Sequence, residues 1–378
     1  MRILIVKLSS LGDVVQTMPV VHDIRQAFPQ AQIDWVVEEA FAPLVQEVSG
    51  VRRVLPIAQR RWRKSWFAAP TKLERAAFAK LLQAQAYDAV IDFQGLIKSA
   101  LVARSARLAP GGFRATYANA SEACAYEWPV RWLLDRTLPM PRRIHAVARY
   151  RLLAALALGY TAEGANIYPL VPLPLGVPLS ERYGVVLAHG TTRADNEWPE
   201  AQWIALGRQL INQGHTVELP QVGATELARV QRIAAALGSQ ARVWPALSLA
   251  QVAQRMAACS GVIGVDSGLS HLAVALDAPH VQIFSQPRAW RAGPVGCTYQ
   301  VALGGQAAPS VAEVWAAWLA VGVAYASAHP GTRLDAPTRV TSNLQEGADA
   351  NTPAAVVSTG PTAAAPQSAP TTNTRPRA

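Results

Sequence analysis

Short apolar runs alternate with stretches of helical periodicity along most of this 378-residue chain. The runs are rich in β-branched residues, which predicts strands. The predicted strands cover residues 2–7, 33–37, 53–57, 89–92, 184–188, 216–219, 262–265 and 281–284. Helical patterns are predicted at residues 14–28, where Pro19 indicates the start of the regular helix, and at 201–213, 225–237, 249–258 and 269–276. Such alternation is typical of parallel sheets covered by helices, so the predicted fold class is α/β.

The length of the chain predicts more than one domain. With 51% hydrophobic residues, 378 residues exceed what one core usually supports. Four prolines, Pro169, Pro172, Pro174 and Pro178, predict a stiff connector between two domains. After about residue 326 the composition changes to Ala, Thr, Pro and Ser, which predicts a disordered tail. The predicted organisation is a domain at 1–168, a linker at 169–182, a domain at 183–325 and a tail at 326–378.

The net positive charge of the chain indicates which kinds of partner it binds. Lys and Arg outnumber Asp and Glu by 35 to 25, which leaves a formal net charge of +10. This surplus favours an anionic partner. Nucleic acid, an acidic membrane surface and a phosphorylated substrate would each account for it. No zinc-finger, helix-turn-helix or RNP-like motif accompanies the surplus, so we expect no nucleic acid as partner.

Cysteine usage and hydropathy bear on the compartment. Cys124, Cys259 and Cys297 are too few and too scattered for a disulfide framework or a zinc site, which predicts a reducing compartment. The apolar run after Arg2 is too short for a signal peptide. No stretch reaches the roughly 18 uninterrupted apolar residues of a membrane-spanning helix. Any membrane association is therefore predicted to be peripheral.

Two loops of the first half follow predicted strands directly. Open α/β folds bind ligands at the carboxyl edge of the sheet, so polar residues there are candidates. The loop at 7–13 offers Asp13, which we expect to project into the crevice. The alternative is that Asp13 only caps the next helix, and the two roles are not exclusive. The loop at 92–99 offers Gln94, Lys98 and Ser99 to the same crevice.

A cation cluster lies at residues 60–66, in a segment that we predict to be a loop. It places four Arg or Lys side chains around two tryptophans. Such a cluster suits phosphate or carboxylate groups. The alternative is a solvated surface run without a ligand.

Two loops of the second half are suited to phosphate. Residues 189–193 combine a glycine amide, two threonine hydroxyls and the guanidinium of Arg193. Residues 264–271 join a strand to a helix whose first amides would be free to bind an anion. The alternatives are that Asp266 only caps this helix and that His271 is structural.

These five segments in this order resemble the lipopolysaccharide heptosyltransferases of glycosyltransferase family 9, in particular those that add the first heptose of the inner core. The resemblance spans residues 1–325. It implies the GT-B architecture, with two Rossmann-like domains facing a central cleft. It also implies an inverting transfer without a metal or a cofactor. The implied acceptor is Kdo2-lipid A, bound by the first domain, and the implied donor is ADP-L-glycero-β-D-manno-heptose, bound by the second.

The resemblance also implies roles for individual residues. Asp13 matches the family's general base. The implied donor-binding residues are Thr191, Thr192, Asn196, Glu226, Leu247, Asp266, Ser267, Gly268 and His271. The implied acceptor-binding residues are Ser10, Arg60, Arg61, Arg63, Lys64, Gln94, Lys98 and His145. A lipid-linked acceptor places the protein in the cytoplasm, in peripheral contact with the anionic face of the inner membrane.

Three segments depart from the family pattern. The family commonly carries a lysine where this chain has Asn196, and close relatives carry an arginine where it has Ser121. Residues 285–288 lack the usual Gly-Pro-Thr turn. Two further hypotheses therefore stay open: a heptosyltransferase that adds a later heptose, and a catalytically weakened protein that binds an ADP-sugar.

Overall fold

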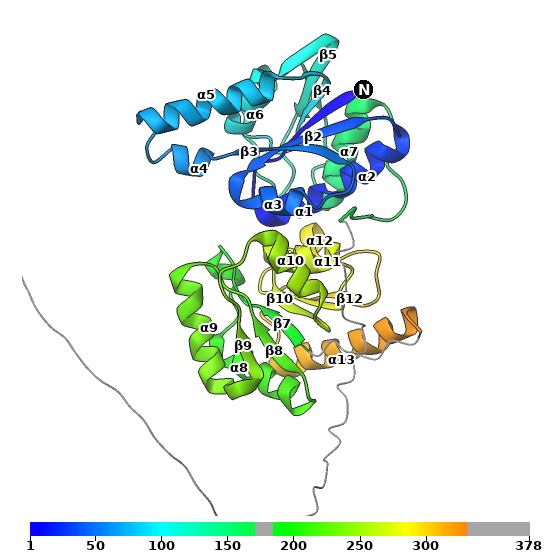
Figure 1. Ribbon diagram of the computed structural model, residues 1–378. Helices are drawn as coiled ribbons and strands as arrows, with labels where there is room; N and C mark the ends of the chain where they lie inside the picture. Colours follow the sequence, from blue (N-terminus) through cyan, green and yellow to red (C-terminus); the bar gives the residue numbers. More distant parts are fainter. Residues whose placement is uncertain (171–183, 331–378) are drawn as a thin grey trace, which may run out of the picture. The chain divides into compact units, whose positions relative to one another are not determined.

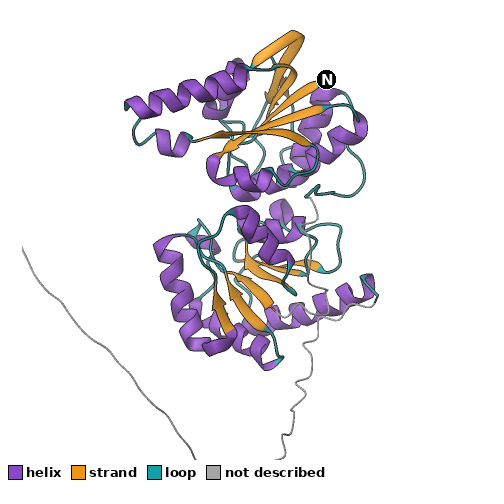
Figure 2. Ribbon diagram, viewed as in Figure 1, coloured by secondary structure: helices purple, strands orange, loops and turns teal. Residues whose placement is uncertain are grey.

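Two six-stranded parallel sheets, each covered by helices, make up the protein (Figures 1 and 2). The computed structural model describes residues 1–170 and 184–330. The described part of the chain thus confirms the α/β class, with one sheet in each half.

The first sheet has the strand order β3-β2-β1-β4-β5-β6. Its strands are β1 (Arg2–Val6), β2 (Gln32–Glu38), β3 (Val51–Ile57), β4 (Ala86–Asp92), β5 (Arg107–Tyr117) and β6 (Arg136–Leu138). The helices of this half are α1 (Leu11–Thr17), α2 (Pro19–Ala27), η1 (Glu39–Phe41), α3 (Ala42–Val45), α4 (Gln59–Trp62), α5 (Ala69–Gln83), α6 (Ile97–Ser105), η2 (Trp128–Trp132) and α7 (Ala146–Leu158).

The second sheet has the order β12-β11-β10-β7-β8-β9. Its strands are β7 (Gly184–Ala188), β8 (Thr216–Leu219), β9 (Ala241–Val243), β10 (Gly261–Val265), β11 (His280–Phe284) and β12 (Gln300–Gly304). The helices are η4 (Ala194–Asn196), α8 (Glu200–Asn212), α9 (Gly223–Leu237), η5 (Gly238–Gln240), α10 (Leu249–Ala257), α11 (Gly268–Ala275), α12 (Ala289–Ala292) and α13 (Val311–Ala328).

The central strands are buried on both faces, which explains why they are continuous apolar runs. In β1, Ile3 and Ile5 belong to one hydrophobic cluster, whereas Leu4 and Val6 belong to the cluster on the opposite face. The strand β7 divides its residues between two clusters in the same alternating way. Each sheet is therefore the middle layer of three.

Both sheets have the Rossmann strand order, and this order locates the ligand-binding edge. The order reverses between β1 and β4 in the first sheet and between β7 and β10 in the second. Ligands bind such sheets beyond the carboxyl ends of the strands at the reversal. The four loops that the sequence singled out follow these four strands.

Most predicted elements have the expected type, with bounds that differ by a few residues. Three expectations need correction. The helical pattern at 14–28 is two helices, α1 and α2, which are separated at Met18. The segment at 60–66 is not all loop, because α4 includes residues 60–62. The helix α13 continues through Ala328, so the predicted tail at 326–378 begins with helical residues.

Several elements lacked a clear sequence signal and were not predicted, among them α5, α7, β5, β6, β9, β12 and α13. Most of the predicted linker, and the tail after residue 330, lie outside the described residues. The proposed division of the chain into domains therefore remains a prediction.

One described helix, α13, is long and apolar enough to cross a membrane by length and composition. The expectation that no stretch qualifies was too strict, because it required an uninterrupted apolar run. One stripe of α13 packs on the second sheet through Val314, Trp318, Val321 and Tyr325. This spacing of three and four residues is typical of a helix that packs one face on a sheet.

The two sheets belong to one compact unit, and α1 packs against α11. Two glycines permit this contact. A Cβ on Gly12 would meet the ring of His271, and a Cβ on Gly268 would meet the side chain of Leu11. The first turns of both helices, each following a central strand, are thus held together.

Candidate active site

Asp13 lies in the first turn of α1, where β1 ends. Its Oδ2 accepts hydrogen bonds from the backbone N–H of Ser10 at 3.1 Å and from the Ser10 hydroxyl at 2.9 Å. Ser10 is the N-cap of α1 and Asp13 is the N3 residue of the same capping box, so Asp13 is not the N-cap itself but does help to cap the helix. The carboxylate is 25% exposed and its Oδ1 faces other groups. Asp13 is therefore held by its own helix and remains accessible.

A chain of buried groups supports Asp13 from the sheet side. The Tyr150 hydroxyl donates to Asp13 Oδ1 at 2.8 Å, and Lys7 Nζ donates to the same hydroxyl at 3.0 Å. Lys7 Nζ also lies 3.9 Å from Asp13 Oδ1 and donates to the carbonyl of Phe93. Burial lowers the pKa of Lys7 to about 8, so the amine is largely protonated at neutral pH. Burial raises the pKa of Tyr150, which therefore stays a donor.

A second cation reaches Asp13 from the other half of the chain. Arg291, on α12, places Nη2 at 3.8 Å from Asp13 Oδ1. Burial alone would raise the pKa of Asp13, but Lys7, Arg291 and the hydrogen bonds from Tyr150 and Ser10 outweigh it and lower that pKa below its ordinary range. The carboxylate is therefore ionised at neutral pH, and the same cations weaken it as a base.

The loop after β4 is built around Gln94 and Asp92. Gln94 is buried, and its Oε1 accepts from the N–H groups of Leu8 and Ser9 at 3.2 and 3.1 Å. Asp92 accepts from the N–H of Gln94 at 2.9 Å, and burial raises the pKa of Asp92 to about 6. Gln94 thus joins the β4 loop to the β1 loop that carries Asp13, while Lys98 lies exposed on α6.

The cation cluster divides into paired and unpaired side chains. Arg61 is held between two carboxylates, at 3.0 Å from Glu39 and 2.8 Å from Glu74. Arg60, Arg63 and Lys64 are exposed and have no carboxylate within 4 Å among the described residues. Arg63 and Lys64 are therefore free to meet an anion, whereas Arg60 lies over the Phe41 ring near Glu38 and Arg61 is largely neutralised.

In the second half, the loop after β7 packs beside Asp266. Thr191 Oγ1 donates to the Asp266 carbonyl at 3.4 Å, while Thr192 is exposed. Asn196 is 3% exposed, and its Nδ2 donates at 3.2 Å to both the carbonyl and Oδ2 of Asp266. Gln282 Nε2 donates to Asp266 Oδ1 at 3.3 Å. Where the family commonly carries a lysine, this chain thus has the neutral amide of Asn196, which orients the Asp266 carboxylate.

The helix α11 starts directly after Asp266. Ser267 is its N-cap, so the hypothesis that Asp266 caps the helix is wrong. The Ser267 hydroxyl is buried and has no hydrogen-bond partner among the described residues. His271 Nε2 lies 3.6 Å from Asp266 Oδ1, and burial lowers the pKa of His271. An unused hydroxyl and free helix amides suit an anionic ligand.

Two predicted donor residues lie farther along this half. Glu226, in the first turn of α9, accepts from the N–H of Val222 at 2.8 Å and closely approaches Gly190. Burial raises the pKa of Glu226. Leu247 is partly buried against the core.

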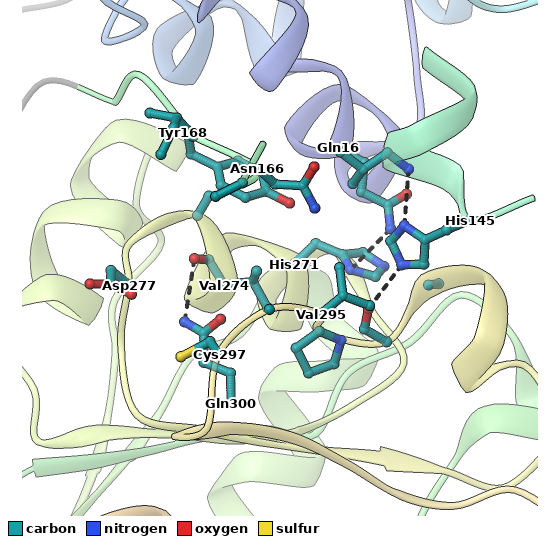
Figure 3. A pocket seen from close by; sticks show the side chains of 18 of the residues that line it. Gln16, His145, Asn166, Tyr168, His271, Val274, Asp277, Val295, Cys297 and Gln300 are labelled. Atoms are coloured by element: carbon teal, nitrogen blue, oxygen red, sulfur yellow. Dashed lines mark hydrogen bonds between the residues drawn. The ribbon is translucent and has the colours of Figure 1, made fainter. Parts of the chain in front are cut away.

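His145 lies in a cavity of about 740 Å³ rather than beside the cation cluster (Figure 3). It is the N-cap of α7, where its Nδ1 accepts from the N–H of Val147. Its Nε2 therefore carries the proton and donates to the Gly293 carbonyl at 2.9 Å. Gln16 and His271 line the same cavity and lie 3.4 Å apart. The imidazole of His145 thus links α7 to the loop after α12.

Three residues of this site are not predicted by the sequence: Lys7, Tyr150 and Arg291. Lys7 was in a motif, and its burial at a strand end could have marked it. Tyr150 and Arg291 are in unremarkable stretches far from Asp13 in sequence, so no local signal points to them. Among the described residues, no group of three His, Cys, Asp or Glu side chains could hold a metal ion.

An ionised carboxylate lies at one Rossmann switch point, and a helix N-terminus whose buried Ser267 hydroxyl has no partner among the described residues lies at the other. Such an arrangement suits a group-transfer enzyme with a phosphorylated substrate. The sequence matches the profile of glycosyltransferase family 9 (heptosyltransferase) over residues 75–314. The chain belongs to this family, and it is a glycosyltransferase.

Individual relatives support the same conclusion. The chain is 42% identical to lipopolysaccharide heptosyltransferase 1 of Salmonella typhimurium, over 75% of this chain and 88% of the relative. It is 25% identical to heptosyltransferase 2 of the same organism, over 75% and 82%. The chain is thus a member of the glycosyltransferases that transfer heptose in lipopolysaccharide synthesis.

Solved structures of the E. coli heptosyltransferase WaaC have the same fold. The structure of WaaC with ADP matches this chain with a TM-score of 0.73 and 37% sequence identity, and the match covers 83% of this chain and 96% of WaaC. With ADP-2-deoxy-2-fluoro heptose, the TM-score is 0.70, also at 37% identity, with 85% and 98% covered. The architecture is therefore GT-B.

Proposed function

We propose that this enzyme transfers L-glycero-D-manno-heptose from ADP-heptose to a Kdo residue of Kdo2-lipid A, with inversion at the anomeric carbon. Two findings on relatives support the substrates. WaaC binds ADP and ADP-2-deoxy-2-fluoro heptose in solved structures, and the name of the Salmonella relative states that it acts on lipopolysaccharide.

The observation that carries the proposal is the placement of Asp13. Its Oδ1 lies 3.8 Å from Arg291, which comes from the other half. The first turn of its helix packs on α11, whose N-terminus follows β10. A base from one half and an anion site from the other thus lie near each other, as transfer between two substrates requires.

The proposed reaction is a single displacement. The acceptor oxygen attacks the anomeric carbon as the bond from that carbon to the ADP oxygen breaks. The hydroxyl proton passes to Asp13, and ADP leaves with the electron pair. One carboxylate suffices because no covalent intermediate forms.

Charge developing on ADP has several stabilising groups within reach. The first amides of α11, the Ser267 hydroxyl and Arg291 are the groups that we assign to the diphosphate. Drawing Arg291 toward the diphosphate would remove one of the two cations that lower the pKa of Asp13. Asp13 would thereby become a stronger base when the donor is bound.

The acceptor carries carboxylates and phosphates, and we assign the exposed cations Arg60, Arg63, Lys64 and Lys98 to them. A lipid-linked acceptor also places the enzyme at the cytoplasmic face of the inner membrane, in peripheral contact.

The test is a transfer assay with ADP-heptose and Kdo2-lipid A, in which mass spectrometry detects the added heptose. We expect Asp13→Asn to reduce turnover by about two to four orders of magnitude, the range typical of a lost general base, and to leave donor binding nearly unchanged in titration calorimetry. Asp135→Asn, which changes an exposed carboxylate paired with Arg114, is the matched control. Wild-type turnover in Asp13→Asn would refute the assigned role.

The same assay decides between the remaining hypotheses. Transfer only to an acceptor that already carries heptose would indicate an enzyme for a later heptose, which the lower identity to heptosyltransferase 2 disfavours. Donor binding without transfer to either acceptor would indicate a weakened enzyme.

A further inference from the structure

Large apolar side chains are exposed on one region of the first half. Phe67 is 83% exposed, and Trp132 and Trp128 are 69% and 59% exposed. The two tryptophans contact each other edge to face, with ring centroids 4.6 Å apart. Leu101 and Ile97, one turn apart on α6, are also exposed. Aromatic residues left in water at this density indicate a surface with a partner.

These side chains belong to adjoining elements. A groove of about 610 Å³ lies among α4, α5 and α6, and Trp66 and Leu101 line it. The other flank of α6 meets η2, because the N–H of Ile97 donates to Glu127 at 2.6 Å and Arg104 donates to the Leu133 carbonyl. The helix α6 therefore connects the groove to the tryptophan pair, and Figure 1 shows α4, α5 and α6 together.

Unpaired cations accompany these apolar side chains. Arg63 and Lys98 line the groove, and Lys64 and Arg131 are exposed close by in sequence to Trp66 and Trp132. None of these four has a carboxylate within 4 Å in the part of the chain that the structure describes. The neighbouring carboxylates are already engaged: Glu74 by Arg61, and Glu127 by the N–H of Ile97.

We define the aromatic–cationic face by these two sets. Its apolar members are Trp66, Phe67, Ile97, Leu101, Trp128 and Trp132. Its cations are Arg63, Lys64, Lys98 and Arg131, and the first three are also assigned to the lipid-linked acceptor.

Exposed tryptophans prefer the boundary between water and lipid, where the ring enters the headgroup region and the indole N–H stays hydrated. Lys and Arg beside them are attracted to anionic headgroups. A surface that combines both has the composition of a peripheral membrane anchor.

We propose that the aromatic–cationic face binds the surface of a bilayer that contains anionic lipids, with Trp128 and Trp132 inserted among the headgroups. The inference rests on the proposed function, in which the acceptor is lipid-linked. Vesicle binding needs neither donor nor acceptor, so its failure can be distinguished from a failure of transfer.

The experiment measures sedimentation of the full chain with vesicles of phosphatidylethanolamine and phosphatidylglycerol, compared with phosphatidylcholine alone. We expect binding to the anionic vesicles, weakened by high salt, and roughly a tenfold loss of affinity in Trp128→Ser,Trp132→Ser. The matched control is Leu319→Ser,Val323→Ser, which removes an exposed apolar pair from α13 and should leave binding unchanged. Transfer to a deacylated acceptor should persist in both variants.

Equal binding by the tryptophan variant and the wild-type chain would overturn the proposal, as would loss of binding only in the α13 variant. A dimer that dissociates in the tryptophan variant without vesicles would instead assign this face to a second copy. If that variant does not fold, Phe67→Ser provides the same test, because a side chain that is 83% exposed contributes little to packing.

Discussion

At the scale of single residues, the site is a balance of charge around Asp13. Two cations, the Tyr150 hydroxyl and the backbone N–H of Ser10 face one carboxylate, so its pKa is lowered although burial opposes this. Tyr150 occupies the middle of the arrangement, because its hydroxyl accepts from Lys7 and donates to Asp13. The hydroxyl therefore positions both charged groups.

Removing this hydroxyl should disturb both groups. In Tyr150→Phe, buried Lys7 loses one of its two hydrogen bonds, and we expect the free energy of unfolding to fall by about 1–3 kcal/mol. The pKa of Asp13 should rise toward its ordinary range, because the hydrogen bond from Tyr150 helps to lower it. Urea unfolding and a pH–rate profile would measure these effects.

Tyr126→Phe is the control, since the Tyr126 hydroxyl donates only to the Ala118 carbonyl, outside the site. The same stability loss in both variants, with identical pH–rate profiles, would argue against a positioning role for Tyr150.

At the scale of elements, α4 carries cations that differ in their surroundings. Arg61 bridges Glu39 on η1 and Glu74 on α5, whereas Arg63 and Lys64 follow the helix unpaired. The bridge holds α4 against its neighbours, and the unpaired cations remain available to an anion. Adjacent residues of one motif thus have different expected roles.

This difference predicts unequal effects on the acceptor. We expect Arg63→Ala,Lys64→Ala to raise the KM for the acceptor by roughly tenfold, because two charge-assisted contacts are lost, while the KM for the donor stays constant. Arg61→Ala should raise it much less. Steady-state kinetics with each substrate varied in turn would measure this. A larger effect from Arg61, or an effect on the donor alone, would contradict the assignment.

At the scale of the whole molecule, the stability of the fold depends on buried histidines in the second half of the chain. Burial lowers the pKa of His280 to about 4, from an ordinary value of about 6.5. Its Nδ1 donates to the Val262 carbonyl, and its Nε2 has no partner among the described residues. The folded state therefore disfavours protonation of His280 Nε2, which would give the imidazole its positive charge.

In the unfolded chain, the His280 imidazole is protonated below about pH 6.5. The free energy of unfolding should therefore keep the whole contribution of neutral His280 above this pH and decrease as the pH falls toward 4. For His280 the expected loss at pH 5 is about 2 kcal/mol. Urea unfolding between pH 7 and 5 should show a smaller slope for His280→Gln than for the wild type. His22→Gln, on α2, is the control, and equal slopes in all three proteins would refute the prediction.

Local patterns in the sequence determined the α/β class, most central strands and the four loops at the switch points. Buried parallel strands need continuous apolar runs, and each run leaves its polar residues at the same sheet edge. Asp13 and Asp266 were found for this reason, and the family resemblance added the enzyme class.

Only the tertiary structure decided which groups meet those residues. Tyr150 contacts Asp13 across 137 positions, Arg291 approaches it from the other half, and Glu39 and Glu74 neutralise Arg61. The exposed tryptophans became a surface only when η2 packed beside α6. Contacts between residues distant in sequence leave no periodicity or spacing in the chain, because packing of whole elements brings them together.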